Sequence, residues 1–184
     1  MLDASARQRI IAVARRLCGV PYDDSHYDDS WKNLDEPPTK LDCSRFVCRV
    51  AREALGPSAE TFPDDAGELI RRLVVVNEPQ AGDIVGYWRE ATAEDNLGDY
   101  HWDSHWGLGS DLTSSNLKDV DGQPVWHVMI FIGNSTVIGT SKLDGKVVVR
   151  PLHYNDGGQQ RWDLVNASTD SPTPYRRLEL RPDR

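Results

Sequence analysis

Apolar residues recur at helical spacing in the first 75 residues of the chain, whereas shorter apolar runs separated by turn residues fill most of the remainder. The clearest stripe is Phe46, Val47, Val50, Ala51 and Ala54, which is closed by Gly56-Pro57. We predict three helices, one from Asp3 or Ser5 to Leu17, one starting at Asp42 or Cys43, and a short one over about Asp64 to Leu73.

The later apolar runs have the length and spacing of β-strands. Helices followed by strands are typical of the α+β class, with N-terminal helices packed on an antiparallel sheet. We predict strands at Val74–Val76, Ile84–Trp88, His127–Ile132, Thr136–Ser141, Lys146–Pro151 and Tyr175–Leu180.

Residues 89–125 interrupt this pattern, because they lack strand periodicity and are longer than an ordinary connection. Four of the six tryptophans lie in or beside this segment: Trp88, Trp102, Trp106 and Trp126. We therefore expect a single domain spanning residues 1–184 that carries a folded insertion at about 89–125.

Charge and cysteine content exclude several classes of protein. The net charge of −8 is concentrated in residues 23–36 and 89–125, and it argues against a nucleic-acid partner. Three cysteines are too few for a disulfide scaffold. No apolar run is long enough to span a membrane and the N-terminus lacks a secretory signal, so we expect a soluble protein made in the cytoplasm without a signal peptide.

Cys43 and His127 are the candidate catalytic pair. Cys43 lies in the first turn of the predicted second helix, where free N–H groups lower the pKa of a thiol and stabilise an oxyanion. His127 begins an apolar strand, where a buried imidazole needs a partner. The alternative is a small core cysteine and a histidine on the surface at a strand end.

Five short segments, in order along the chain, resemble the NlpC-type bacterial cell-wall cysteine peptidases, which are papain-like enzymes that cut peptidoglycan stem peptides. The D-C-S-G-F motif of that family is similar to Asp42-Cys43-Ser44-Arg45-Phe46, and its H-V-G-I-Y-I-G-N strand is similar to residues 127–134. The other three segments are Gly19-Val20-Pro21-Tyr22, Gln80-Ala81-Gly82-Asp83-Ile84-Val85 and Tyr175-Arg176-Arg177-Leu178.

The resemblance implies that Cys43 attacks the scissile amide, with His127 as its base and then as the acid for the leaving amine. It also implies that Tyr22 lines the substrate groove and that Asp42 and Ser44 receive a free amine of the substrate. Structural roles are compatible with these sites: Asp42 as a helix cap, Ser44 as a first-turn residue and Tyr22 as a packed ring.

The sequence departs from the family at two positions. The residue that orients the catalytic histidine corresponds to Gly139, which has no side chain to do so. A three-residue loop at 133–135 would bring Ser141 opposite His127, a two-residue loop would bring Thr140 to that face, and His153 follows the next strand. We favour Ser141 or His153, although a water or a backbone carbonyl would also serve. Arg45 replaces a glycine and would either point to solvent or touch substrate.

His101 and His105 have a spacing that suits zinc on a helix, but no third strong ligand is evident. We therefore expect neither a metal nor another cofactor, and we assign Trp102 and Trp106 to the rim of the substrate groove.

The leading hypothesis is a cysteine hydrolase of peptidoglycan stem peptides, cutting next to a γ-D-glutamyl or diaminopimelate residue. Its partner would be a peptidoglycan peptide or muropeptide fragment. A secretion machine or lysis would bring the enzyme to the periplasm or wall, and a secreted toxin would require an immunity protein. The alternatives are acyl transfer or hydrolysis of another γ-glutamyl or isopeptide bond, and a non-catalytic module that binds peptidoglycan fragments. Because both acidic segments are expected to rim one groove, we also predict an acidic cleft.

Overall fold

The computed structural model describes residues 2–23, 30–90, 124–153, 155–156, 160–161, 163–164 and 174–181. The chain divides into two compact units, Met1–Trp88 with Trp126–Arg184, and Arg89–Val125. Apart from the ends of two strands, the helices and the sheet belong to the first unit. Its elements are α1 (Ala4–Arg16), η1 (Ser30–Lys32), α2 (Cys43–Leu55), η2 (Gly56–Ala59), α3 (Ala66–Arg72), β1 (Leu73–Val75), β2 (Ile84–Glu90), β3 (Pro124–Gly133), β4 (Thr136–Ser141), β5 (Lys146–Pro151), β6 (Asn155–Asp156), β7 (Gln160–Arg161), β8 (Asp163–Leu164) and β9 (Tyr175–Leu180).

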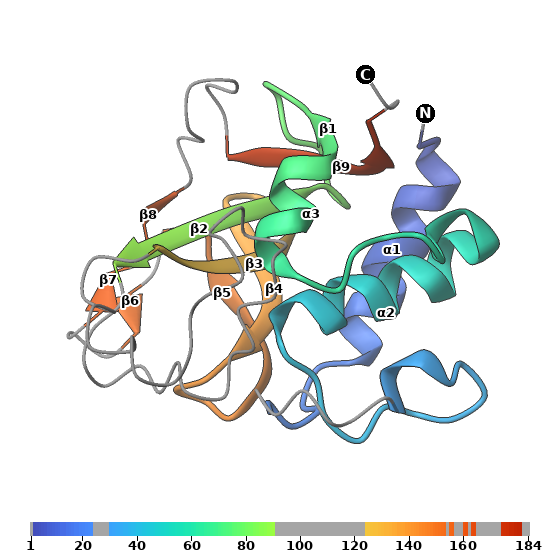
Figure 1. The fold of residues 1–184 in the computed structure, drawn as a ribbon, viewed down its shortest axis with the longest axis horizontal. Helices are drawn as coiled ribbons and strands as arrows, with labels where there is room; N and C mark the ends of the chain where they lie inside the picture. Colours follow the sequence, from blue (N-terminus) through green and yellow to red (C-terminus); the bar gives the residue numbers. More distant parts are fainter. Residues whose placement is uncertain are drawn as a thin grey trace, which may run out of the picture. The chain divides into compact units, whose positions relative to one another are not determined.

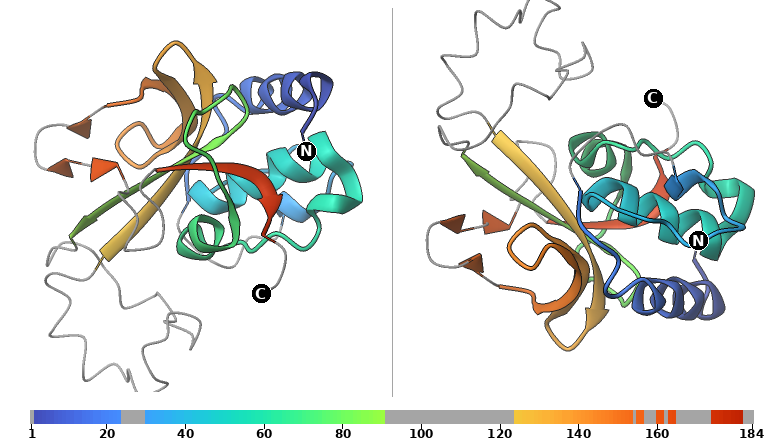
Figure 2. Two further views of the ribbon diagram at one scale, coloured as in Figure 1. Left: turned by 90° about the horizontal axis from the view of Figure 1, so that it is seen from above. Right: turned by 90° about the horizontal axis from the view of Figure 1, so that it is seen from below.

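The main sheet has the strand order β1-β9-β2-β3-β4-β5, and β8 pairs with β2 (Figure 1). The strand pairs whose registers are defined are antiparallel, and a separate pair is formed by β6 and β7. Figure 2 shows α1 and α2 on the same side of this sheet. The α+β class predicted from the sequence is confirmed. The two-residue strands β6, β7 and β8 were not predicted.

Both faces of the sheet are covered by apolar side chains. On the helix side, Val128 and Ile130 of β3 pack with Phe46, Val47 and other residues of the helices. On the opposite face a smaller cluster contains Val85, Tyr87, Met129, Val137 and Leu152. Burial on both faces explains why the sequence of β3 is a continuous apolar run rather than an alternating one.

A two-residue turn joins β3 to β4, and a bulge lies just before it in β3. Asn134 and Ser135 both have positive φ, 50° and 53°, as this tight hairpin turn requires. Gly133 pairs with Thr136, but the register then shifts so that Phe131 pairs with Val137 and Ile130 with Ile138. Extended along the strands, this register places position 127 opposite 141 and position 128 opposite 140. The register expected from a three-residue loop therefore arises from a two-residue loop and a bulge.

The Gly82-Asp83 pair connects α1, β2 and β3. Gly82 has a φ of +95°, and its N–H donates to the Phe131 carbonyl at 2.8 Å. The buried Asp83 carboxylate accepts hydrogen bonds from the Gln80 N–H at 2.8 Å and from Arg7 Nη1 at 2.9 Å. This segment, one of the five that resemble the family, thus fixes the start of β2 in the fold.

Arg49 of α2 holds the loop that contains η1. Arg49 is 2 % exposed, and its guanidinium nitrogens donate to the carbonyls of Trp31, Asn33 and Glu36 at 3.2, 2.6 and 2.8 Å. Glu53, one turn further along the helix, supplies the opposite charge. One buried cation therefore orders a loop that has little regular structure of its own.

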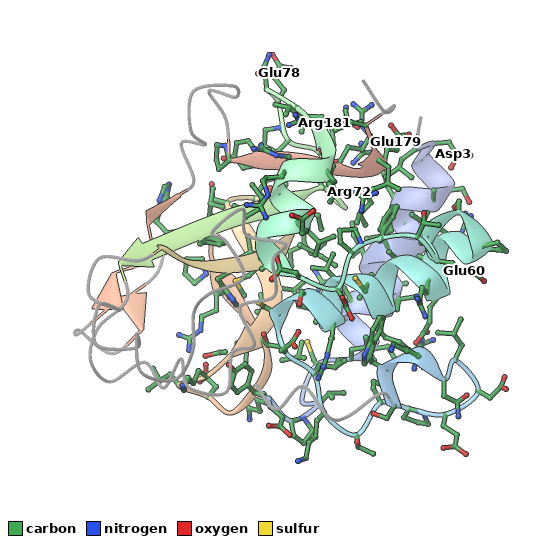
Figure 3. The ribbon with its side chains drawn as sticks, in the orientation of Figure 1. Asp3, Glu60, Arg72, Glu78, Glu179 and Arg181 are labelled. Carbon is green, nitrogen blue, oxygen red and sulfur yellow. The ribbon has the colours of Figure 1, made fainter. Side chains whose placement is uncertain are left out.

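The end of β9 lies against the end of α3. The N–H of Arg181 donates to the carbonyl of Arg72 at 2.8 Å, and both residues are labelled in Figure 3. In the described part of the chain, no helix has both the length and the apolar character needed to cross a membrane.

Candidate active site

Cys43 is the first residue of α2, and the residues just before it fix its position. The Asp42 side chain caps the helix by accepting a hydrogen bond from the N–H of Arg45 at 2.7 Å. Leu41 forms a parallel bridge with Tyr22, and its N–H donates to the Pro21 carbonyl at 2.9 Å. The half-buried Tyr22 is thereby held next to the segment that leads into Cys43.

The Cys43 thiol does not have the lowered pKa expected from a helix N-terminus. Burial, followed by the charge of Asp42, raises the pKa of Cys43 to about 12, and Asp65 adds to the effect. Hydrogen bonds from the backbone amides of Val128 and Ser44 lower the pKa, but they are outweighed. The prediction of a lowered thiol pKa is therefore wrong, because desolvation and two carboxylates favour the neutral thiol.

The Val128 amide connects the thiol to β3. Val128 directly follows His127, so the sulfur of Cys43 lies against the strand at the residue next to the candidate base. His127 is 8 % exposed, and its ring lies 6.0 Å from the ring of Tyr87, tilted by 42°. The Tyr87 hydroxyl is anchored by donating to the Leu152 carbonyl at 3.0 Å. Sequence reasoning did not identify Tyr87 or Asp65, because only the fold brings them to this region.

Met129 occupies the space above Gly139. A Cβ atom at Gly139 would lie 3.0 Å from Cγ and 3.1 Å from Cε of Met129. The resembling family has a glycine at the position of Met129 and a polar residue at the position of Gly139. The large side chain thus lies on β3 instead of β4, and a residue at 139 that orients His127 would require Met129 to move.

Ser141 and His153 were the favoured substitutes for the orienting residue. Ser141 is buried, but its hydroxyl is already engaged. It accepts hydrogen bonds from the Asp144 N–H at 3.2 Å and from Arg150 Nη2 at 3.3 Å, and it donates a hydrogen bond to the Asp144 carboxylate. These contacts hold the turn between β4 and β5. His153 is exposed just after β5. Thr140 is fully buried and faces the helix side with Val147.

Asp42 and Ser44 are both engaged inside the protein. The Ser44 side chain is 5 % exposed, and its hydroxyl lies within hydrogen-bond distance of the Asp64 carbonyl and of Asp42 Oδ1, the latter at 3.0 Å. Arg45 does not point to solvent: it is 6 % exposed, and its Nε lies 3.4 Å from Asp42 Oδ2.

Several predicted features lie outside the described residues. They include Trp102, Trp106, His101 and His105 in the second unit, and residues 24–29 of the acidic segment at 23–36. Residues 30–36 of that segment are held by Arg49, which lies six residues, or about 9 Å, along α2 from Cys43. Within the described ranges, no group of three or more His, Cys, Asp or Glu side chains could hold a metal ion.

The fold resembles several solved structures at low sequence identity. An NlpC/P60 family protein from Bacillus cereus matches 94% of this chain and 40% of its own, with a TM-score of 0.52 and 18% identity. A Staphylococcus aureus protein described as similar to lipoprotein, NLP/P60 family, matches 98% and 43%, with a TM-score of 0.55 and 16% identity. NlpC2 from Trichomonas vaginalis matches 97% and 49%, with a TM-score of 0.53 and 14% identity.

The chain thus spans less than half the length of these three proteins. No protein-family model matches the sequence, and no curated protein matches it. What these comparisons establish is the architecture: the chain has the NlpC/P60 fold.

Proposed function

We propose that the protein is a cysteine hydrolase that cleaves amide bonds in peptidoglycan stem peptides, with Cys43 as nucleophile and His127 as base. The observation that carries this proposal is the position of Cys43. It is the first residue of α2, and its sulfur accepts a hydrogen bond from the backbone amide of Val128, the residue after His127. The NlpC/P60 fold and the motif resemblance supply the substrate class.

In this mechanism, the sulfur attacks the amide carbonyl while His127 takes the thiol proton. The transfer accompanies the attack, because a thiol with a pKa of about 12 is not ionised beforehand. The positive end of the α2 dipole favours the negative charge that develops on the carbonyl oxygen. His127 then protonates the leaving amine, and a thioester forms on Cys43. His127 finally deprotonates a water molecule, which hydrolyses the thioester and restores the thiol.

Two other activities fit parts of the same site. In acyl transfer, or in hydrolysis of another γ-glutamyl or isopeptide bond, the same thioester would form from a different amide, and an amine in place of water would make the enzyme a transferase. One observation favours a non-catalytic module that binds peptidoglycan fragments. Met129 and Gly139 lie where the family that this chain resembles has a glycine and the polar residue that orients its catalytic histidine.

Digestion of purified sacculi, followed by mass spectrometry of the released fragments, tests the proposal. We expect new amine and carboxyl termini with the wild-type protein and none with Cys43→Ala. Cys18→Ser is the matched control, because Cys18 is an exposed cysteine and should be dispensable. Fragments with amines joined to new acyl groups would indicate acyl transfer. Intact sacculi and tight fragment binding would contradict the proposed hydrolysis and favour the binding module.

A further inference from the structure

The first turn of α2 carries a buried cation at a position where cations are disfavoured. Arg45 is the third residue of the helix and is 6 % exposed. The N-terminal end of a helix has a partial positive charge, so a guanidinium there is repelled and must be compensated by an anion. Asp42 supplies this anion, because its Oδ2 lies 3.4 Å from Arg45 Nε.

Both oxygens of the Asp42 carboxylate are therefore in use. Oδ1 accepts from the N–H of Arg45 at 2.7 Å and lies 3.0 Å from the hydroxyl of Ser44. Oδ2 faces the Arg45 guanidinium. The other carboxylate that acts on Cys43, Asp65, caps α3 by accepting from the Glu68 N–H at 2.8 Å. An ammonium group that approached Cys43 from this side would meet a carboxylate that is already paired with Arg45.

We infer that Arg45 is a specificity-determining residue, which directs the site away from peptides with a free α-amine and towards peptides whose amino end is acylated. This inference rests on the proposed function and deepens it. A free ammonium would have to displace Arg45 from Asp42, which would break an ion pair between two largely buried side chains. An acylated amino end carries no charge and needs no such exchange. Stem peptides still joined to the glycan through an amide have this property.

Two synthetic peptides test the inference: L-Ala-γ-D-Glu-diaminopimelate with a free amino end, and the same peptide N-acetylated. We expect the kcat/KM of the wild-type protein to be roughly tenfold or more higher for the acetylated peptide, because the ammonium of the free peptide would lie near the like charge of Arg45. Arg45→Gly should reduce this ratio to about one or below, whereas Arg45→Lys, which keeps the cation, should retain most of it. The ratio is the readout because a changed Cys43 reactivity affects both peptides equally.

A second substitution attributes the change to Asp42. Asn at position 42 still caps a helix but has no charge, so Arg45→Gly combined with Asp42→Asn should lose the activity on the free amine that Arg45→Gly gains. A wild-type preference for the free amine, or a ratio that Arg45→Gly leaves unchanged, would overturn the inference.

Binding separates this inference from the proposed function. Calorimetry of Cys43→Ala with the two peptides measures the same preference without turnover. A protein that cleaves neither peptide but binds the acetylated one more tightly overturns the hydrolase proposal and supports the role of Arg45. Equal binding, or tighter binding of the free amine, overturns the role of Arg45 even where cleavage occurs.

Discussion

The ionisation of Cys43 can be measured from its alkylation by iodoacetamide across pH. Only the thiolate reacts, so the rate at a given pH follows the ionised fraction. With a pKa of about 12, that fraction at pH 8 is about one part in 10⁴, against roughly a quarter for an unperturbed thiol. We therefore expect the rate at Cys43 to rise about tenfold for each pH unit between 7 and 10, without a plateau.

Replacing a residue that raises the pKa of Cys43 should shift the curve of alkylation rate against pH in a known direction. Asp42→Asn removes a carboxylate that raises the pKa of Cys43 and keeps the helix cap, so its rates should be higher than those of the wild type at each pH. Peptide mapping by mass spectrometry reports the exposed Cys18 in the same sample as an internal control for the reagent. A plateau at Cys43 between pH 6 and 8 would refute the reasoning, because it would mean that the thiolate is already formed.

The remaining predictions concern stability and packing. Arg49→Met should lower the free energy of unfolding in urea by about 3–5 kcal/mol, because it leaves buried carbonyls and the Glu53 charge without their donor. Arg16→Ala removes a side chain that contacts the same Glu53 but is 63% exposed, so it should change the stability by less than about 1 kcal/mol. Equal losses of stability in the two variants would contradict the structural role of the buried Arg49. Gly139→Ala should lower the free energy of unfolding by about 1–3 kcal/mol in the same assay, because the new Cβ meets Met129. Adding Met129→Ala should relieve that contact. An unchanged stability in Gly139→Ala would show that the space above Gly139 is open.

The local elements could be predicted from the sequence because each has its own signals. The apolar stripe and the Gly56 stop delimited α2, and Asp42 was identified as its cap. The apolar run of β3 was found with the correct position of His127, although the strand extends further at its start. The pairing of β3 with β4 could be anticipated, but its register could not be fixed from loop length, because a bulge between Phe131 and Gly133 gives a two-residue loop the register expected from a three-residue one.

The electrostatics of the site could not be predicted in the same way. A helix N-terminus lowers a thiol pKa, but burial and two carboxylates reverse the sign at Cys43, and one of these, Asp65, comes from another helix. Arg45 was similarly ambiguous, because its pairing with Asp42 depends on the degree of burial that only packing sets. The contact between Tyr87 and His127 joins neighbouring strands distant in sequence, and no local pattern indicates it.

Joint action of Cys43 and His127 is the central claim, and a double-mutant cycle on kcat/KM for stem-peptide cleavage tests it most directly. If the two residues act as one unit, Cys43→Ala and His127→Ala should each abolish nearly all of the activity, and the double variant should be no less active than the weaker single variant. Effects that multiply in the double variant, or substantial activity in Cys43→Ala, would contradict the claim.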